Sequence, residues 1–464
     1  MTEDEIKSLE EKLMFKQKNT YEIMSDGEIK KAYDFAEKYK TFMNNAKTER
    51  EGVRQIVSEA REKGFKEYEF GKKYSSGDKV YFVNREKAVI LCVIGKKSLS
   101  EGVKICAAHI DSPRLDLKQN PLYQDGGLAL FKTHYYGGIK KYQWTTVPMS
   151  LHGVMVKRDG TKVNVNIGED DGDPEFVVTD LLPHLAQEQE KKSLASGVKG
   201  EDLNLLVGSR PFKGDDSSEN IKLNILNLLF EKYGVTEEDF LSSELEAVPA
   251  FKAVDIGFDR SMIGAYGHDD NVDAYPAAQA CINAENPEYT VMSVLTDKEE
   301  IGSMGNTGLR SSYMKYFIND LAKSEGLEGW QVLRKSECLS ADVTAAYDPT
   351  YPEVMDKNNC AYLNKGVAVM KYTGARGKSG TSDCSAEFFG KVRNMLDDNN
   401  VVWQLGALGK VDVGGGGTVA QFVADLDVDV VDVGVAVLSM HAPFEVISKT
   451  DLWQAYRAFE VFFK

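Results

Sequence analysis

The run Ala88-Val-Ile-Leu-Cys-Val-Ile-Gly95 is closely followed by a second apolar run, Val103-Lys-Ile-Cys-Ala-Ala-His109. Both are short and bounded by glycine and charged residues, a pattern typical of buried β-strands. Further strands and helices are predicted in alternation after them. This order predicts an α/β protein with a mixed, largely parallel sheet flanked by helices. The expected strands are 290–295, 337–341, 366–372 and 428–433, and the expected helices are 274–284, 382–399 and 449–463.

Two regions depart from this alternation. Residues 1–65 are rich in Glu, Lys and Ala with apolar residues at helical spacing, and predict two or three amphipathic helices. Residues 119–248 carry paired glycines, an acidic turn and short alternating stretches such as Lys162–Ile167, which predict an inserted β-rich domain. We expect a long exposed loop at 191–215. The remaining residues, 1–118 and 249–464, would form one catalytic domain.

Composition places the chain among soluble globular proteins. A chain of 464 residues is too long for one small hydrophobic core, which favours two domains. Hydrophobic residues make up 42% and charged residues 28%, with no run of about 18 apolar residues that could cross a membrane. The first residues are acidic and lack the pattern of a signal peptide. We therefore expect a cytoplasmic protein.

Charge and cysteine usage exclude further classes. The formal net charge of -16 disfavours nucleic acid as a partner, because phosphate backbones would be repelled. The six cysteines are scattered and form no CxxC pair, which indicates reduced, buried thiols rather than disulfides or a thiolate zinc site.

Five stretches place metal-ligand residue types just after apolar runs, where open α/β sheets bind their ligands. Each alone is weak: a histidine can be structural, an aspartate can cap a helix, and a glutamate pair can lie on an exposed loop. Together they supply two histidines and several carboxylates without cysteine, which suits zinc, manganese or cobalt at a two-metal hydrolytic centre. The residues are His109 with Asp111, Asp269 with Asp270, Glu299 with Glu300, Asp342, and His441.

These motifs, in their order and rough spacing, resemble the aspartyl aminopeptidase family of two-zinc exopeptidases, metallopeptidase family 18. The resemblance covers most of the chain and is fainter over residues 1–65. The matching stretches are His109-Ile-Asp-Ser-Pro113, Asp269-Asp-Asn271, Asp297-Lys-Glu-Glu-Ile-Gly-Ser303, Ser340-Ala-Asp342 and Ser439-Met-His-Ala442, and, in the insert, Tyr136-Gly-Gly138, Trp144, Pro148, Gly153 and Pro183-His-Leu-Ala186.

The resemblance implies a zinc-aminopeptidase-like catalytic domain and a role for each site residue. Two divalent ions per subunit would be bound, zinc first, with cobalt or manganese as alternatives. His109 and Asp342 would hold one ion, Glu300 and His441 the other, and Asp269 rather than Asp270 would bridge them. Glu299 would be the general base, and Asp111 would orient His109.

The resemblance also implies a substrate site. Family members often prefer an N-terminal Asp or Glu, which requires a cation in the pocket. Lys371 occupies the family's position for it, with Arg376 and Lys378 as alternatives. His184 matches a histidine that the family's insert offers to a neighbouring subunit, but Gln187-Glu188 follow where eukaryotic members carry a second histidine, which points to a broader specificity. Gly415 would let the backbone approach the substrate, since its glycine run lacks the Gly-Lys-Ser/Thr ending of a phosphate loop.

The implied function is metal-dependent removal of the N-terminal residue from peptides. The family further implies that the insert mediates dimerisation and that dimers build a hollow tetrahedral dodecamer. A related two-metal amide hydrolase or deblocking peptidase remains an alternative. A non-enzymatic shell or receptor on the same scaffold is disfavoured, because the five ligands and the base are all present.

Overall fold

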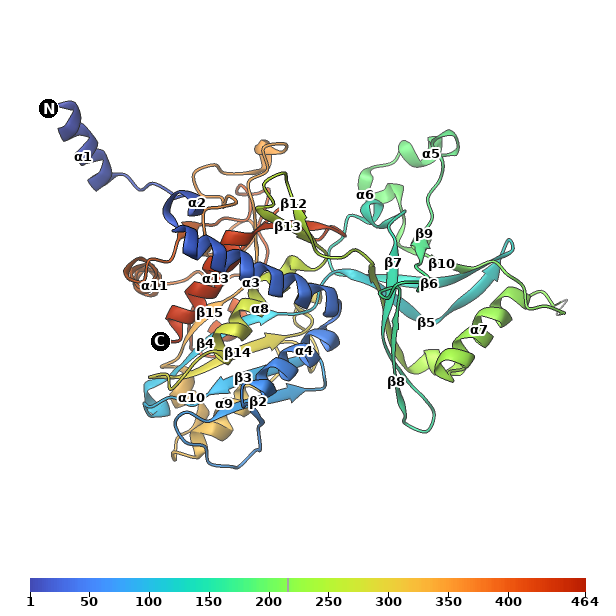
Figure 1. Ribbon diagram of the computed structural model, residues 1–464, viewed down its shortest axis with the longest axis horizontal. Coiled ribbons are helices and arrows are strands. Elements are labelled where there is room, and N and C mark those ends of the chain that lie inside the picture. Colours follow the sequence, from blue (N-terminus) through green and yellow to red (C-terminus); the bar gives the residue numbers. More distant parts are fainter. Residues whose placement is uncertain (215–216) are drawn as a thin grey trace.

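The computed structural model describes residues 1–214 and 217–464 and shows two lobes (Figure 1). The first lobe is built on a nine-stranded sheet of order β1-β2-β3-β14-β4-β15-β19-β17-β18. Strands β14, β4, β15 and β19 are parallel, and β2, β3 and β17 run antiparallel to a neighbour, so the predicted mixed, largely parallel α/β sheet is confirmed. The bounds are β1 Lys66–Glu67, β2 Lys79–Asn84, β3 Ala88–Val93, β14 Thr290–Thr296, β4 Val103–His109, β15 Glu337–Ser340, β19 Asp429–Gly434, β17 Val367–Met370 and β18 Trp403–Leu405.

Helices cover both faces of this sheet, which explains why its strands read as continuous apolar runs. Every residue of β3 is buried; its alternate residues Val89 and Leu91 face one core, and Ile90 faces the other. The predicted helices near 274–284, 382–399 and 449–463 are confirmed. One core packs against α3 Asp26–Asn45, α4 Glu49–Glu62, α8 His268–Ile282, α11 Ala386–Asp398 and α13 Lys449–Phe462, and the other against α9 Tyr313–Lys323, α10 Gly329–Leu333 and α12 Ala420–Ala424.

The second lobe is a seven-stranded antiparallel sheet of order β8-β7-β11-β5-β6-β10-β9, with α7 Asn220–Tyr233 packed against it. Its core contains the fully buried Trp144. The sheet starts at Arg114, a few residues before the expected insert limit at 119. The bounds are β5 Arg114–Asp125, β6 Leu128–Tyr136, β7 Met149–Val156, β8 Lys162–Ile167, β9 Val177–Val178, β10 Leu205–Gly208 and β11 Ser243–Pro249.

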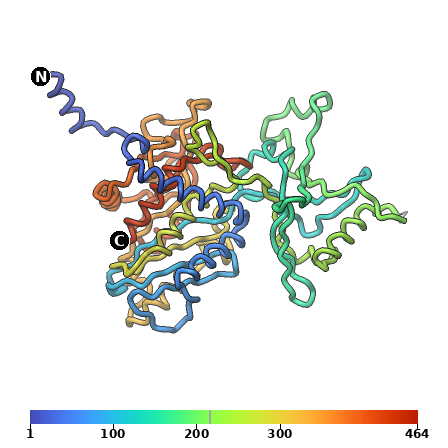
Figure 2. The backbone as a smooth tube through the Cα atoms, in the orientation of Figure 1, coloured from blue at the N-terminus to red at the C-terminus, as the bar shows by residue number. Residues whose placement is uncertain are grey.

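Small elements complete the fold. A three-stranded sheet comprises β12 Val254–Ile256, β13 Met262–Ala265 and β21 Glu445–Ser448, and β16 Thr344–Ala345 pairs with β20 Ala436–Val437. Helices α1 Glu3–Leu13 and α2 Thr20–Ile23 precede α3, so residues 1–65 hold four helices rather than two or three. The tube in Figure 2 shows α1 projecting from the body, and none of its residues is buried.

The expectation of a long exposed loop at 191–215 is wrong over the described part of that range; Asp215 itself lies outside the described residues. The segment contains α6 Leu194–Gly197 and β10, which pairs with both β6 and β9. Burial of Leu203 and Leu205 anchors it in the lobe's core. All six cysteines are free and buried, as predicted. Among the described residues, no helix combines the length and apolarity needed to cross a bilayer.

Candidate metal centre

The five predicted metal-ligand stretches meet at one edge of the large sheet. His109 is the last residue of β4, and Asp342 follows β15. Glu299 and Glu300 lie in a short 3-10 helix, Glu299–Ile301, just after β14. Because β4, β14 and β15 are parallel neighbours, their carboxyl ends bring these side chains together. Asp269, in the first turn of α8, and His441, between β20 and β21, complete the set.

Asp269 lies between the two histidines. Its Oδ1 is 3.1 Å from His109 Nε2, and its Oδ2 is 3.1 Å from His441 Nε2. The carboxylate is almost fully buried. Burial would raise the pKa of Asp269, but its hydrogen bonds with His109 and His441 outweigh that effect and lower it. The two oxygens of one carboxylate thus face two separate imidazoles.

The ring orientation of each histidine is set by a backbone carbonyl. His109 Nδ1 donates to the carbonyl oxygen of Asp111 at 2.9 Å, and His441 Nδ1 donates to that of Gly138 at 2.7 Å. A carbonyl can only accept, so each Nδ1 carries a hydrogen and each ring turns its Nε2 toward Asp269. Proteins orient metal-binding imidazoles in this way. Burial lowers the pKa of each imidazole, but the hydrogen bonds to carboxylates outweigh that effect and raise the pKa, to about 10 for His441, so each Nε2 holds a proton that a metal ion would replace.

Three further carboxylates surround this pair. Glu299 Oε2 and Asp342 Oδ1 both lie 4.0 Å from His109 Nε2, and Glu300 Oε1 lies 3.6 Å from His441 Nε2. Burial raises the pKa of Glu299 to about 7 and raises the pKa values of Glu300 and Asp342. Glu300 Oε1 is buried without a hydrogen-bond donor. The cluster therefore holds more negative charge than its histidines balance.

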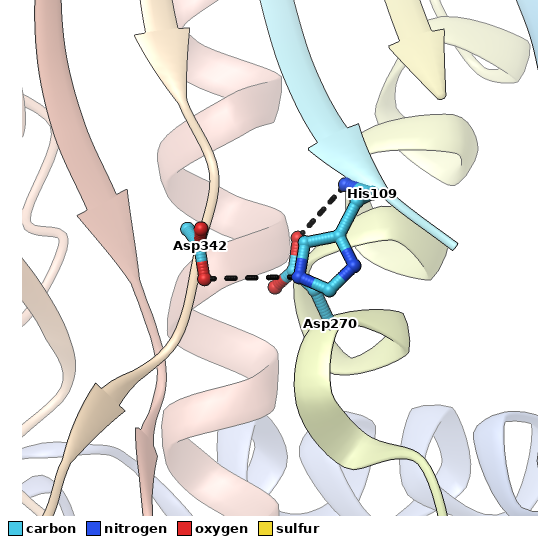
Figure 3. Close-up of side chains that lie close together, drawn as sticks. All are labelled: His109, Asp270 and Asp342. Carbon is cyan, nitrogen blue, oxygen red and sulfur yellow. Dashed lines mark hydrogen bonds and ion pairs between the residues drawn. The ribbon is translucent and has the colours of Figure 1, made fainter. Parts of the chain in front are cut away.

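Asp270 is a further acidic residue at the cluster. The family resemblance implies a bridging role for Asp269 and no metal-binding role for Asp270. Its Oδ2 accepts the backbone N–H of His109 at 3.2 Å, and its peptide bond with Asp269 is cis. Figure 3 shows both carboxylates beside His109, with Asp342 joined to the ring and Asp270 joined to the backbone nitrogen. Two groups could each hold a cation: His109, Asp270 and Asp342, and His109, Asp269 and Glu300.

Two buried carboxylates hold the backbone around the cluster. Asp111 accepts the N–H of Glu299 at 3.1 Å and that of Glu300 at 3.2 Å. Its contact with His109 runs through its carbonyl, whereas its Oδ1 is 3.4 Å from that ring. Glu445 accepts the N–H groups of His441 at 2.7 Å and Asp269 at 3.1 Å. Sequence reasoning did not find Glu445; its only signal is its position four residues after His441.

The three expected substrate-binding residues lie outside this set of contacts. Lys371 follows β17, whose last residue, Met370, pairs with Asp432 of β19 and so lies, across Ser340 of β15, at the level of Ala107 in β4. Its ammonium is half exposed and lies 3.5 Å from Asp383. His184 is exposed in a 3-10 helix, Pro183–Leu185, of the second lobe.

Gly415 packs against its own chain. Its φ is +110°, and a Cβ there would lie 2.5 Å from Ala375 Cα. The glycine is therefore required by the close approach of residues 374–375, whatever the substrate does.

The donor set fits a divalent metal such as zinc. Imidazole nitrogen and carboxylate oxygen are ligands that zinc accepts, and both Nε2 atoms face carboxylate oxygens. Each such pair needs a positive charge between its two atoms, which a proton on Nε2 supplies until a metal ion replaces it. Among the ion pairs of residues 1–214 and 217–464, none joins a lysine or arginine to Asp269, Glu299, Glu300 or Asp342.

Buried histidines and carboxylates at the carboxyl edge of a mixed α/β sheet define a metal-dependent hydrolase. A family model described as aminopeptidase I zinc metalloprotease (M18) matches residues 42–463, and the chain belongs to this family. The predicted membership of metallopeptidase family 18 is confirmed, and the chain is a metallo-aminopeptidase by family.

Individual relatives agree over nearly the full length. The probable M18 family aminopeptidase 1 of Clostridium acetobutylicum is 48% identical over 458 residues, covering 97% of this chain and 98% of the relative. The crystal structure of an M18 family aminopeptidase from Thermotoga maritima superposes with a TM-score of 0.93 at 44% identity, covering 97% and 99% of the two chains. The fold is shared with the S. cerevisiae mApe1 dodecamer structure, with a TM-score of 0.76 at 19% identity over 93% and 96% of the chains.

Proposed function

We propose that the protein removes the N-terminal residue from peptides at a site holding two divalent metal ions. The bridging geometry of Asp269 carries this proposal, because one carboxylate that faces two separate imidazoles is arranged to be shared by two cations. His109 and Asp342 would hold one ion, and Glu300 and His441 the other. Two such ions would supply Lewis acidity and lower the pKa of an attacking water.

Glu299 is the proposed general base. Its backbone is fixed by Asp111, and its Oε2 lies beside the cluster without a fixed cation of its own. Burial raises the pKa of Glu299 to about 7, where a carboxylate can both accept and release a proton near neutral pH. Glu299 Oε2 would take the proton of the attacking water and then deliver it to the leaving amine. Asp111 would position the backbone of Glu299 and take no part in the proton transfer.

For the substrate, we propose a peptide with a free N-terminal amine and a broad preference at that residue. Lys371, or Arg376 and Lys378 nearby, would favour an acidic side chain, but the ammonium groups of Lys371 and Lys378 already face Asp383. His184 and Gly415 remain proposed contacts of the substrate-binding region.

For assembly, we propose that residues 119–248 form a dimerisation domain and that the chain works as a homo-oligomer, a dodecamer built from dimers. The dodecameric state of the yeast mApe1 structure and its shared fold support this. Six buried free thiols suit a reducing compartment such as the cytoplasm.

The test is a substrate panel on metal-free protein with zinc, cobalt or manganese restored separately. Free-amine substrates with N-terminal Glu, Leu or Ala and their N-acetylated forms would be compared. Cleavage of the free-amine set alone, with about two ions bound per chain, supports the proposal. Preference for the acetylated set would support the deblocking alternative, and one ion at full activity would remove the two-metal mechanism.

A further inference from the structure

The end of β6 in the second lobe contacts the metal centre of the first lobe at successive residues. We propose that the segment Tyr136–Gly138 is a positioning element of the metal centre. In it, the Tyr136 hydroxyl holds Asp111 and the Gly138 carbonyl holds His441. This inference rests on the proposed function and adds to it a role for the β-rich lobe within the catalytic site of its own chain.

Tyr136 acts through Asp111. Its hydroxyl donates to Asp111 Oδ2 at 2.8 Å, and both side chains are buried. The same carboxylate accepts the N–H groups of Glu299 and Glu300, and the carbonyl of Asp111 accepts the Nδ1 hydrogen of His109. Three donors on one buried carboxylate leave it little freedom to rotate. The Tyr136 hydroxyl is the donor that comes from outside the first lobe, and its loss leaves a buried acceptor with one bond fewer.

Gly137 and Gly138 act on the other half of the centre. The Gly138 carbonyl accepts from His441 Nδ1, which points Nε2 at Asp269. Gly137 has a φ of +77°, and a Cβ there would lie 3.0 Å from Glu300 Oε2 and 3.4 Å from its Cβ. The segment must therefore pass Glu300 at a distance that only glycine allows. Both proposed ligands of the second ion, Glu300 and His441, contact it.

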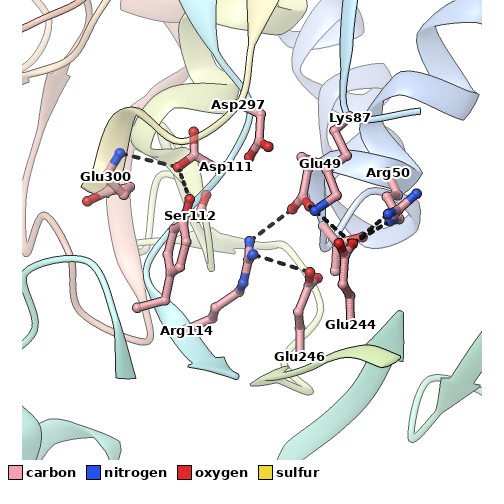
Figure 4. Close-up of polar contacts among 12 residues, drawn as sticks. Glu49, Arg50, Lys87, Asp111, Ser112, Arg114, Glu244, Glu246, Asp297 and Glu300 are labelled. Atoms are coloured by element: carbon pink, nitrogen blue, oxygen red, sulfur yellow. Dashed lines mark hydrogen bonds and ion pairs between the residues drawn. The ribbon is translucent and has the colours of Figure 1, made fainter. Parts of the chain in front are cut away.

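Arg114 connects the segment Tyr136–Gly138 to both lobes. The Arg114 guanidinium lies 4.1 Å from the centre of the Tyr136 ring. Arg114 in turn pairs with Glu49 of α4 in the first lobe at 2.9 Å and with Glu246 of β11 in the second at 3.2 Å (Figure 4). A displacement of the second lobe would shift Tyr136 and Gly138, and through them Asp111 and His441.

The experiment compares Tyr136→Phe with Tyr135→Phe in the full-length zinc-loaded protein. The first change removes the hydroxyl on Asp111 and keeps the ring on Arg114. The second removes the same hydroxyl from the neighbouring, half-exposed tyrosine of the same strand. The readouts are the zinc Kd, from competition with a chromophoric chelator, and kcat, KM and their pH profile on a free-amine substrate.

We expect Tyr136→Phe to weaken zinc binding or lower kcat by about 10–100-fold, with KM little changed and an altered pH profile. Tyr135→Phe should match the wild type in every readout. Gly137→Ala is the second variant: its methyl group presses on Glu300, so zinc affinity should fall without loss of the folded state by circular dichroism.

Wild-type zinc affinity and turnover in both Tyr136→Phe and Gly137→Ala would overturn the proposal. A lower Tm with unchanged zinc affinity and pH profile would also overturn it, because that pattern belongs to a purely structural residue. Failure of the proposed function looks different: the wild type would bind zinc and cleave no peptide, and the ratio of zinc affinities between Tyr136→Phe and wild type would still decide the positioning role.

Discussion

Two clusters of carboxylates, most of them buried, lie close together in this molecule, and they are neutralised in different ways. The interlobe cluster joins Glu49, Glu244 and Glu246 to Arg50, Lys87 and Arg114, as Figure 4 shows. In the metal centre, Asp269, Glu299, Glu300 and Asp342 contact histidines, and no lysine or arginine of the described residues pairs with them.

The difference identifies which cluster binds a ligand. A buried carboxylate needs a countercharge, because desolvation strongly disfavours an isolated ion. The interlobe cluster contains its own cations, so its carboxylates need no ligand from solution. Its ion pairs connect the two lobes. The metal centre has imidazoles in their place, and burial raises the pKa values of Glu299, Glu300 and Asp342. It is therefore built to receive cations from solution.

The largest expected effect is on kcat, and it distinguishes the proposed general base, Glu299, from the proposed metal ligands. Glu299→Gln keeps the shape of the side chain and removes its proton acceptor, so kcat should fall by about 10²–10⁴-fold with zinc content retained. Steady-state kinetics and metal analysis on the same preparation check this, with the exposed Glu175→Gln as the matched control. Near-full turnover in Glu299→Gln would show that another group takes the proton.

The sequence located the residues that gather at this centre better than the residues that hold them in place. Strands such as β4 and β14 are buried on both faces, so they appear in the sequence as apolar runs. The residues at their carboxyl ends therefore lie at the ligand-binding edge of the sheet. The hydrogen bond from His441 Nδ1 to the Gly138 carbonyl could not be predicted in this way. It joins residues 303 positions apart, across the two lobes, and no local pattern encodes it.

The same limit explains the wrong loop expectation. The segment after residue 191 is mostly polar, and its one apolar run, at 203–207, is too short to show a clear strand or helix period beside the glycine, lysine and aspartate around it. Only the tertiary pairing of β10 with β6 and β9, and the burial of Leu203 and Leu205, turn it into part of the second sheet.

Breaking the charge balance of the interlobe cluster should cost stability. Arg114→Ala leaves Glu49 and Glu246 buried without their shared cation, and removal of one partner of a buried pair typically costs about 3–5 kcal/mol. Urea unfolding monitored by circular dichroism measures this. Lys30→Ala, which removes an exposed pair with Asp34, should cost less than about 1 kcal/mol. Equal effects of the two variants would mean that burial does not distinguish the pairs.

Chelation should act on the metal centre alone. Zinc bound to the folded state stabilises it by about 2.7 kcal/mol when free zinc is a hundredfold above its Kd. Removing the metal should lower the free energy of unfolding by that order, and adding zinc back should restore it. The additional loss caused by Arg114→Ala should be similar with and without metal. If chelation left wild-type stability unchanged, the view that the cluster needs an external cation would fail.

The smallest effect tests a second interlobe contact, His152, which lies 2.8 Å from Glu51 of α4 and 3.2 Å from Glu169. Burial lowers the pKa of His152, but these two carboxylates outweigh it and raise the pKa above the ordinary value of about 6.5. The folded state thus binds this proton more tightly than the unfolded state. Its contribution is fully present below about pH 6.5 and is lost as pH rises through the raised pKa.

His152→Gln keeps hydrogen-bonding capacity without that titration. The difference in unfolding free energy between wild type and His152→Gln should therefore shrink with rising pH, by at most about 1.4 kcal/mol per pH unit. Unfolding curves from pH 5.5 to 9 measure it, and subtracting the variant cancels the titration of Lys47, whose pKa burial lowers to about 8. A difference that stays constant across this range would mean that folding leaves the pKa of His152 unchanged, so that its contacts with Glu51 and Glu169 add no stability that depends on its charge. The charged links between the lobes would then be those of the interlobe cluster around Arg114, Arg50 and Lys87 rather than that of His152.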